Sequence, residues 1–473
     1  MILTLDIGTT TLKGALFDDA GTLCSFKYAT VPSQGFLIDP FQWSLALKTV
    51  CSSFPSLSEV DTVTISGNGP TLVPVFGNVE DRGGILSCDS AMARLWHDRR
   101  ATQESEEVSR LANSFVDASF SLPKALYVYN REPEIYEKTK FFLSSYDFFN
   151  YLLTGEAKTI LHAKGSERWY WNDMILEQLA LDKTKFPAFC YPGQLIGTVS
   201  SLASLCLGIG AGATVYAGAP DFFVSILGTG AVSLGRVCDR SGTSEGINLC
   251  TKEPLGDNRL MAYRHPIKPY YNVSGIISSS GQAILWAKNL FGLKEASYDR
   301  LYEEMAEAKP GSGNLIFLPY LCGERAPIWD AKARGVFNGL ALETGRAEML
   351  RSVAEGVCFA MRDVITVMED LGAKVGELRL SGGPTHSTFL NQLKADITRR
   401  EVLIPMITDA ELVGDLIIAQ TAKNRYASLS EAAEDLVSIK KRYTPNPAVQ
   451  GLYEDLFAVY RSTYQKLKER KSQ

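Results

Sequence analysis

The sequence predicts a mixed α/β fold built from two related halves. A glycine-threonine turn follows the first apolar strand at 7–11 (IGTTT), and a similar turn recurs at 241–249 (SGTSEGINL). Each turn leads into strand and helix patterns, and no short-period repeat is visible. These observations indicate an ancient duplication, with the break between the halves near 235–240.

The first half opens as a hairpin, because two short apolar strands are followed by a turn at 18–21 (DDAG). Apolar runs and helical spacing place the later elements. We expect strands at 2–5, 14–17 and 213–220, and helices at 40–53, 98–112, 144–153 and from Asp221.

The second half repeats this alternation and ends in an amphipathic helix. We expect a strand at 377–381 and helices at 278–291, 297–308, 344–371, 387–398, 411–425 and 449–470. The predicted domains are an N-terminal lobe at 1–236, a C-terminal lobe at 237–440 and a tail helix within 441–473. The tail helix has an aromatic side that is either buried core, which the spacing favours, or a homodimer interface (Tyr453, Phe457, Tyr460, Tyr464).

Composition excludes several classes of protein. The 473 residues carry 48 Lys and Arg against 53 Asp and Glu, so the chain lacks the basic excess of a nucleic-acid binder. Nine scattered cysteines without zinc spacing indicate reduced thiols in a cytoplasmic protein. The nearly uncharged stretch 186–235 is broken by prolines and glycines, so we predict no membrane helix there.

Two glycine-threonine turns fit phosphate groups. In DIGTTTLK at 6–13, Gly8 lets the backbone approach phosphate oxygens, Asp6 is placed to hold Mg²⁺, and Lys13 is placed to offset phosphate charge. An ordinary hairpin turn is the alternative interpretation. In SGTSEG at 241–246, glycine again stands beside small hydroxyl residues, and the pair of turns suggests a bound nucleotide.

Asp221 is the one charged residue between 186 and 235. It is either the N-cap of the helix that follows or a catalytic base that accepts the proton of an attacking hydroxyl. A base of this kind also aligns the nucleophile with the γ-phosphate.

A glycine pair in the second half suggests a nucleoside site. In LSGGPTHSTFLNQLKADI at 380–397, a strand meets Gly382 and Gly383 and a helix follows, so a purine or ribose can lie against the backbone. Gly414, in ELVGDLIIA at 411–419, is expected to open space for the base. A plain strand-to-helix turn is the alternative.

Taken in order, these stretches resemble the FGGY family of carbohydrate kinases, within the actin, Hsp70 and hexokinase superfamily. The resemblance runs from DIGTTTLK to YTPNP at 443–447, and its most specific stretch is FLPYLCGERAPIWDAKARGVFNGL at 317–340. It implies two ribonuclease-H-like lobes with an interdomain cleft, and ATP, Mg²⁺ and a small sugar as ligands. The xylulokinase branch is the most similar.

The resemblance also assigns roles. It implies Mg²⁺ and γ-phosphate contacts at Asp6, Thr9 and Thr10, and a general base at Asp221. It further implies contacts to the β- and γ-phosphates and to adenosine at Gly242, Thr243, Ser244, Gly382, Gly383, Asn391 and Gly414.

The sugar side departs from the branch pattern. The usual Gln-Met-His loop is replaced by Gly67–Thr71, which makes Asn68 and Gly69 the candidates there. The family's Trp-x-Asp-x-Arg segment matches either Trp96 with Asp98 or Cys88 with Asp89, and we favour the first. Substrate alternatives to xylulose are ribulose, gluconate, glycerol and erythritol. A non-catalytic ATP-binding regulator is a further alternative.

Overall fold

The computed structural model describes residues 1–33, 35–167 and 170–471, and its contacts divide the chain into two compact units. Unit 1 comprises Met1–Gly228 with Glu411–Ala432, and unit 2 comprises Thr229–Ala410 with Ala433–Gln473. The predicted boundary at 236 lies near this division. Segment 411–432, however, was expected in the second lobe and belongs to unit 1.

Unit 1 is built on a six-stranded sheet in the order β12-β13-β5-β1-β2-β3. Strands β1, β5 and β13 are parallel, whereas β2, β3 and β12 join antiparallel. The predicted opening hairpin is confirmed. The strands are β1 (Ile2–Ile7), β2 (Thr11–Phe17), β3 (Leu23–Thr30), β5 (Thr62–Gly67), β12 (Leu195–Thr198) and β13 (Thr214–Pro220).

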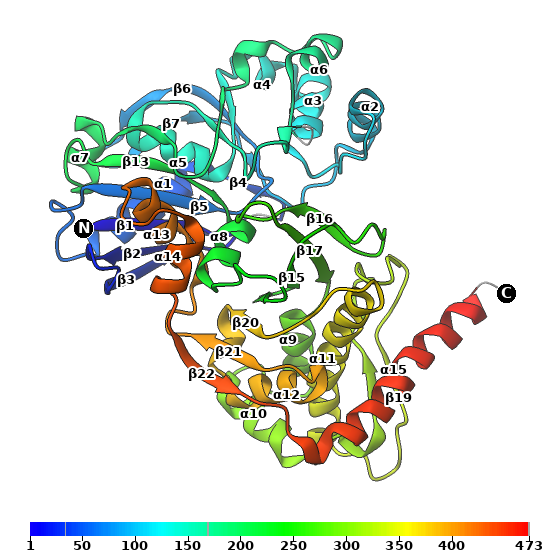
Figure 1. Cartoon of the computed structure of the whole chain (residues 1–473). Coiled ribbons are helices and arrows are strands. Elements are labelled where there is room, and N and C mark those ends of the chain that lie inside the picture. The colour runs from blue at the N-terminus through cyan, green and yellow to red at the C-terminus, as the bar shows by residue number, and fades with distance from the viewer. Residues whose placement is uncertain (34, 168–169, 472–473) are drawn as a thin grey trace. The chain divides into compact units, whose positions relative to one another are not determined.

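The two faces of this sheet are covered by segments from distant parts of the sequence. Gly14 faces Val50 of helix α1 (Pro40–Ser52), so its neighbour Lys13 and the paired Asp6 face the other way. Helix α13 (Ala410–Ala422) lies beside the first strands (Figure 1), where Gln420 donates to the Asp19 carbonyl at 3.1 Å.

The rest of unit 1 consists of shorter elements. A three-stranded sheet has the order β7-β6-β9. Its strands and the other short strands are β6 (Val73–Asp81), β7 (Leu86–Ser90), β9 (Phe141–Leu143), β4 (Leu37–Ile38), β8 (Ala93–Arg94), β10 (Thr159–Ile160) and β11 (Phe189–Cys190). The helices are α2 (Thr102–Ala112), α3 (Ser121–Arg131), α4 (Pro133–Lys138), α5 (Ser145–Thr154), α6 (Asp173–Gln178), α7 (Ser201–Leu207) and α8 (Asp221–Gly228). Of these, α2, α3, α4 and α6 enclose a second cluster of buried apolar residues, while α5 and α7 pack on the first.

Helix α2 begins at Thr102 rather than at the predicted residue 98. The Asp98 carboxylate accepts hydrogen bonds from the backbone and side chain of Arg100, with N–O distances of 2.8 to 3.1 Å. An aspartate that bonds its own local backbone favours a turn over a helix, so 96–100 is a loop.

Unit 2 repeats the strand order of unit 1. Its seven-stranded sheet runs β16-β17-β15-β14-β20-β21-β22, with β14, β20 and β21 parallel. As in unit 1, the first two strands form a hairpin, and the first strand pairs in parallel on its other side. This topology supports the predicted duplication. The strands are β14 (Val237–Ser241), β15 (Glu245–Thr251), β16 (Met261–Arg264), β17 (Tyr271–Ile277), β20 (Leu378–Ser381), β21 (Val402–Pro405) and β22 (Ile439–Tyr443).

The helices of unit 2 enclose its core, and their predicted positions are confirmed to within a few residues. They are α9 (Gly281–Leu290), α10 (Tyr298–Glu307), α11 (Arg346–Asp370), α12 (Thr388–Thr398) and α15 (Gln450–Lys471). Helix α14 (Leu429–Leu436) crosses from one unit to the other, and strands β18 (Ile316–Leu318) and β19 (Val336–Asn338) form a separate pair.

The aromatic side of the tail helix α15 is core, as the spacing favoured. Tyr453, Phe457, Tyr460 and Tyr464 are all buried within the unit 2 cluster, and the Tyr460 hydroxyl lies 2.7 Å from that of Tyr320. All nine cysteines are free thiols. Within the described ranges, no helix is long and apolar enough to cross a membrane.

The substitution Tyr460→Ala should lower the free energy of unfolding by about 3 to 5 kcal/mol, because it empties a fully buried site. Urea unfolding followed by circular dichroism measures the loss. The control is Val459→Ala, on the exposed side of the same helix, for which we expect a change within about 0.5 kcal/mol. Equal losses in the two variants would contradict the buried position.

Candidate functional site

The predicted metal ligand Asp6 and the predicted base Asp221 lie at the same edge of the sheet of unit 1. Asp6 lies near the carboxyl end of strand β1, and Asp221 comes directly after strand β13. Strand β5 lies between these two strands in the sheet. All three strands are parallel, so their carboxyl ends meet at one edge. Two strand spacings separate the carboxylates by roughly 10 Å.

Asp6 is buried, and its surroundings combine a hydroxyl, a cation and a second acid. The Ser66 hydroxyl lies 3.3 Å from its Oδ1 atom, and Lys13 is its partner in the antiparallel register. Directly opposed residues of an antiparallel pair lie on one face of the sheet. Asp6 and Lys13 therefore lie on the same face of the sheet, and their contacts with Mg²⁺ and phosphate stay predictions.

A third acid, Asp415 of α13, escaped the sequence analysis. It is fully buried, and neither carboxylate oxygen has a hydrogen-bond partner among the described residues. Burial raises the pKa of Asp415 well above its ordinary value, and the charges of Asp6 and Glu411 add to the rise, although Ser66 opposes it. Asp415 is therefore more readily protonated than an exposed aspartate. Among the described side chains, no group of three potential metal ligands comes together.

Asp221 is the first residue of α8 and is half-buried. Its Oδ1 atom accepts the Phe222 amide at 2.7 Å, and its carbonyl accepts the Ser225 hydroxyl at 2.7 Å. Ser225 also contacts Glu411 at 2.9 Å, which ties α8 to α13. One carboxylate oxygen of Asp221 thus interacts with the start of the helix. The side chain is partly exposed, and the role of Asp221 as a base stays a prediction.

The Gly8–Thr10 turn connects the phosphate candidates to a sugar candidate. The Gly8 amide donates to the Thr11 carbonyl at 2.9 Å, and Thr10 is exposed. The indole N–H of Trp96 donates to the Thr9 hydroxyl at 3.0 Å, while 38% of the Trp96 side chain remains exposed. The structure therefore places Trp96 beside this turn, with part of its ring open.

Asp98 and Asp89, the two alternative sugar contacts, differ in their environments. Asp98 is buried and ion-paired with Arg100, and it follows Trp96 in the same loop. Asp89 is on β7, exposed and ion-paired with Arg82. Of these two segments, the one with Trp96 has a hydrogen bond to the Gly8–Thr10 turn, and the choice between Asp98 and Asp89 as a sugar contact stays a prediction.

The loop at 67–71 is held by interactions within the protein. The Asn68 side chain is buried, donates to the Ile7 carbonyl at 3.0 Å and accepts the Thr71 hydroxyl at 2.5 Å. Asn68 therefore has a clear structural role, and its contact with a sugar stays a prediction. Gly69 lies against the Tyr146 ring.

Lys124 of α3 joins the two predicted sugar loops, and sequence reasoning did not single it out. Its buried ammonium donates to the Pro70 carbonyl at 2.8 Å and to the Leu95 carbonyl at 2.7 Å. Burial lowers the pKa of Lys124 to about 7, and the Asp98 charge opposes that shift only in part. A signal was present in the sequence, because Lys124 lies in LPKALYVYNREPEIY at 122–136, a further stretch that resembles the FGGY family.

In unit 2 the Gly242–Ser244 turn lies against the N-terminus of α9. Gly281 donates its amide to the Gly242 carbonyl at 3.0 Å, and Ser280 and Gln282 donate theirs to the Thr243 carbonyl at 3.2 and 3.1 Å. Gly242 and Thr243 are exposed. The turn is therefore both anchored and accessible.

The Gly382–Gly383 turn lies beside that first turn, because it follows the parallel neighbour β20. Gly382 has φ of +91°, and a Cβ atom there would lie 2.1 Å from the Ser241 carbonyl oxygen, so only glycine fits. Asn391 is buried and donates to the Thr385 carbonyl at 2.7 Å, while its Oδ1 atom has no partner in the described parts of the chain.

Gly414 belongs to unit 1, whereas the two glycine turns above belong to unit 2. A Cβ atom at Gly414 would lie 2.0 Å from the Val224 carbonyl oxygen, so the glycine lets α13 pack tightly on α8. Gly414 therefore has a clear packing role, and its contact with adenosine stays a prediction.

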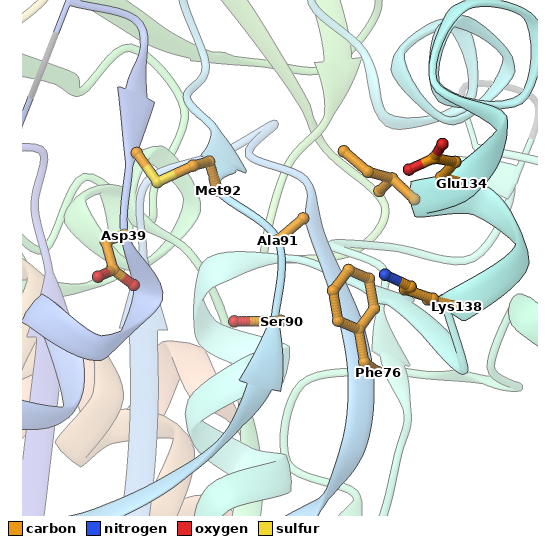
Figure 2. Close-up of a pocket in the computed structure, with 8 residues that line it drawn as sticks. Asp39, Phe76, Ser90, Ala91, Met92, Glu134 and Lys138 are labelled. Atoms are coloured by element: carbon orange, nitrogen blue, oxygen red, sulfur yellow. The ribbon is translucent and has the colours of Figure 1, made fainter.

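A surface pocket of about 480 Å³ also occurs in unit 1 (Figure 2). Its lining includes Phe76, Met92, Glu134 and Lys138 and none of the candidate residues above. It is a feature separate from the candidate site.

Two family models match this chain. The model of the N-terminal domain of the FGGY family of carbohydrate kinases matches residues 1–228, and the model of the C-terminal domain matches 240–422. The chain belongs to the FGGY family of carbohydrate kinases. As an FGGY kinase it is a sugar phosphotransferase, and ATP use is implied.

Individual relatives of this FGGY kinase agree on the class and differ in substrate. A xylulose kinase of Lactococcus lactis is 26% identical, covering 99% of this chain and 97% of the relative. A ligand-bound xylulose kinase structure from Lactobacillus acidophilus has a TM-score of 0.83 at 23% identity, covering 99% of this chain and 98% of that one. A gluconate kinase structure from the same organism has a TM-score of 0.83 at 24% identity, with 98% of both chains covered. The two structures show a shared fold.

The low pKa of Lys124 should make the stability of the FGGY kinase depend on pH. Between about pH 7 and 10 the unfolded chain binds a proton at Lys124 that the folded protein lacks, so stability rises with pH. Lys124 contributes up to about 1.4 kcal/mol per pH unit to this rise in the free energy of unfolding. Urea unfolding at pH 7, 8 and 9 should show a smaller rise in Lys124→Met than in the wild type.

The control for this measurement is Lys183→Met, because Lys183 is exposed on the same unit. It should keep the wild-type slope. If Lys124→Met and the wild type gained stability equally over this range, the depressed pKa would be refuted.

Proposed function

We propose that this chain transfers the γ-phosphoryl group of ATP to a hydroxyl of a ketopentose such as xylulose. The observation that carries the proposal is the arrangement in unit 1, where Asp6, the Gly8–Thr10 turn and Asp221 gather at the carboxyl ends of parallel strands. Two carboxylates roughly 10 Å apart leave room for a phosphoryl group and an acceptor hydroxyl between them. Phosphoryl transfer depends mainly on such positioning and on charge stabilisation.

Asp221 acts as the general base in this proposal. One of its carboxylate oxygens takes the Phe222 amide, which fixes the orientation of the group at the start of α8. The carboxylate accepts the proton of the sugar hydroxyl as that oxygen attacks the γ-phosphorus. An aspartate of ordinary pKa suffices, because the base is needed chiefly for alignment.

Asp6 would hold Mg²⁺ together with phosphate oxygens and water. Mg²⁺ commonly uses only one or two protein carboxylates beside phosphates, so the lack of a three-ligand group in the described residues is compatible with it. When bound, the ion neutralises charge on the transferred phosphoryl group. Thr9, Thr10 and Lys13 would contact that group from the same turn and its following strand.

Unit 2 would bind the nucleotide. The Gly242–Ser244 turn is anchored by the first amides of α9, and its own backbone amides would bind the phosphate oxygens. The Gly382–Gly383 turn and Asn391 would contact the adenosine, and the unpartnered Asn391 Oδ1 atom is an acceptor suited to an exocyclic amine.

On the sugar side, Trp96 would offer the open part of its ring to the substrate. Its indole N–H is held by Thr9, so the ring is fixed beside the phosphate turn. Xylulose is preferred because the Lactococcus lactis relative, which is similar over 99% of this chain, is a xylulose kinase. Gluconate is the second candidate, since a gluconate kinase shares the fold equally well.

The substitution Asp221→Asn should reduce kcat about a thousandfold, because it removes the proton acceptor while keeping the shape of the side chain. ADP release coupled to a panel of ketoses, aldoses and polyols measures the effect. The matched control is Asp173→Asn, at the first residue of helix α6 and exposed, which should keep wild-type turnover. The proposal would be contradicted if the wild type turned over none of these compounds, or if Asp221→Asn turned them over as fast as the wild type.

The substitution Trp96→Ala should raise KM for the sugar on the order of tenfold and leave KM for ATP nearly unchanged, because it removes an aromatic contact surface. Asp89→Asn should change the sugar KM far less, since Asp89 pairs with Arg82 away from the turn. Steady-state kinetics with each substrate varied in turn measures both constants. The reverse order of effects would favour the Asp89 alignment.

A further inference from the structure

Unit 2 contains a buried charge cluster that the roles above do not use. Lys394 of α12 donates to Asp239 Oδ2 at 2.6 Å, to Glu245 Oε1 at 2.5 Å and to the Ser241 hydroxyl at 2.7 Å. All four side chains are buried. Lys394 is 155 residues from Asp239 in the sequence, so only the fold brings the cluster together.

The hydrogen bonds of the cluster are complete. A lysine ammonium has three N–H donors, and here each donor has its own acceptor. Ser241 also lies 3.0 Å from Asp239 Oδ1 and 3.2 Å from Glu245 Oε1. With one carboxylate protonated, every donor and acceptor around this hydroxyl is satisfied.

The charges are unequal within the cluster, because one ammonium faces two carboxylates. Burial and the neighbouring Glu245 raise the pKa of Asp239 well above its ordinary value. The pKa of Glu245 is lowered despite its burial, because Lys394 lies against it. Of the two carboxyl groups, Asp239 is therefore the more readily protonated, and Glu245 the more readily ionised beside Lys394.

Glu245 connects this cluster to the Gly242–Ser244 turn. Its Oε2 atom accepts the Ser280 hydroxyl in a short hydrogen bond, and the Ser280 amide donates to the Thr243 carbonyl. Ser241 and Glu245 are also the residues directly before and after the turn. Lys394 thus holds both ends of the turn and, through Ser280, the helix start that contacts it.

These contacts fix the direction of two peptide groups. The Gly242 and Thr243 carbonyls point toward the first turn of α9, where they accept amides. In a trans peptide the N–H points opposite to the carbonyl, so the amides of Thr243 and Ser244 point away from α9. Two such N–H groups at an exposed turn form a donor pair for phosphate oxygens.

We propose that Lys394 and Glu245 are positioning residues for the nucleotide phosphates, acting by holding the Gly242–Ser244 turn so that its amides face the ligand. This inference rests on the proposed function, because it takes the turn to bind the phosphates of ATP. The two residues do not touch the nucleotide. They determine how well the donors of the turn are oriented before ATP arrives.

A matched pair of isosteric variants tests the inference. Glu245→Gln and Asp239→Asn each replace one carboxyl group of the same cluster, but only Glu245 adjoins the turn and Ser280. Calorimetric titration of the full-length protein with ATP and with adenosine, in magnesium chloride, measures binding. Glu245→Gln should weaken ATP about tenfold and leave adenosine unchanged, whereas Asp239→Asn should bind both within about twofold of the wild type.

The comparison with adenosine separates positioning from general damage. Wild-type affinity of Glu245→Gln for ATP would overturn the inference, and so would equal weakening of ATP and adenosine. If circular dichroism shows that Glu245→Gln does not fold, Ser280→Ala removes only the link to α9 and should again weaken ATP selectively. A wild-type protein that binds no ATP would instead refute the proposed function, and the inference with it.

Discussion

Each unit depends on one topological constraint: its first strand forms an antiparallel hairpin with the next strand of the chain and pairs in parallel on its other side. In unit 1 this strand is β1, and in unit 2 it is β14. The hairpin turn after such a strand lies at the same edge as the carboxyl ends of the parallel strands. The glycine-threonine turns and the residues proposed for catalysis and nucleotide binding all occur at these two edges. A change of pairing at β1 or β14 would move every candidate residue of that unit.

In each unit a buried lysine holds loop segments in place. Lys124 joins the loops at 70 and 95, and Lys394 holds the ends of the turn at 242–244. Each lysine has several acceptors at once. The two carboxylates beside Lys394 outweigh its burial and raise its pKa, whereas burial still lowers the pKa of Lys124. Burial likewise raises the pKa of Asp415 well above its ordinary value.

The sequence allowed prediction of features whose parts are adjacent along the chain. The strand, glycine turn and neighbouring acid at 2–10 are local, as are the β13–α8 junction at Asp221 and the aromatic stripe of α15. Lys124, Lys394 and Asp415 were missed because their significance comes from partners far away in sequence and from burial. The start of α2 was misplaced because the Asp98–Arg100 interaction competes with helix formation. The packing role of Gly414, whose small size allows helices α13 and α8 to approach closely, could not be seen in the sequence.

The discontinuity of unit 1 has a consequence for biosynthesis. Helix α13, which places Asp415 near Asp6 and packs on the helix that carries Asp221, is encoded after most of unit 2. A chain emerging from the ribosome therefore has the first 228 residues long before it has this helix, and domains generally fold in order of emergence. The face of the sheet that bears Asp6 stays uncovered throughout that interval. Unit 1 is thus completed late in synthesis, and a chain that ends before residue 410 lacks the helix that packs on α8.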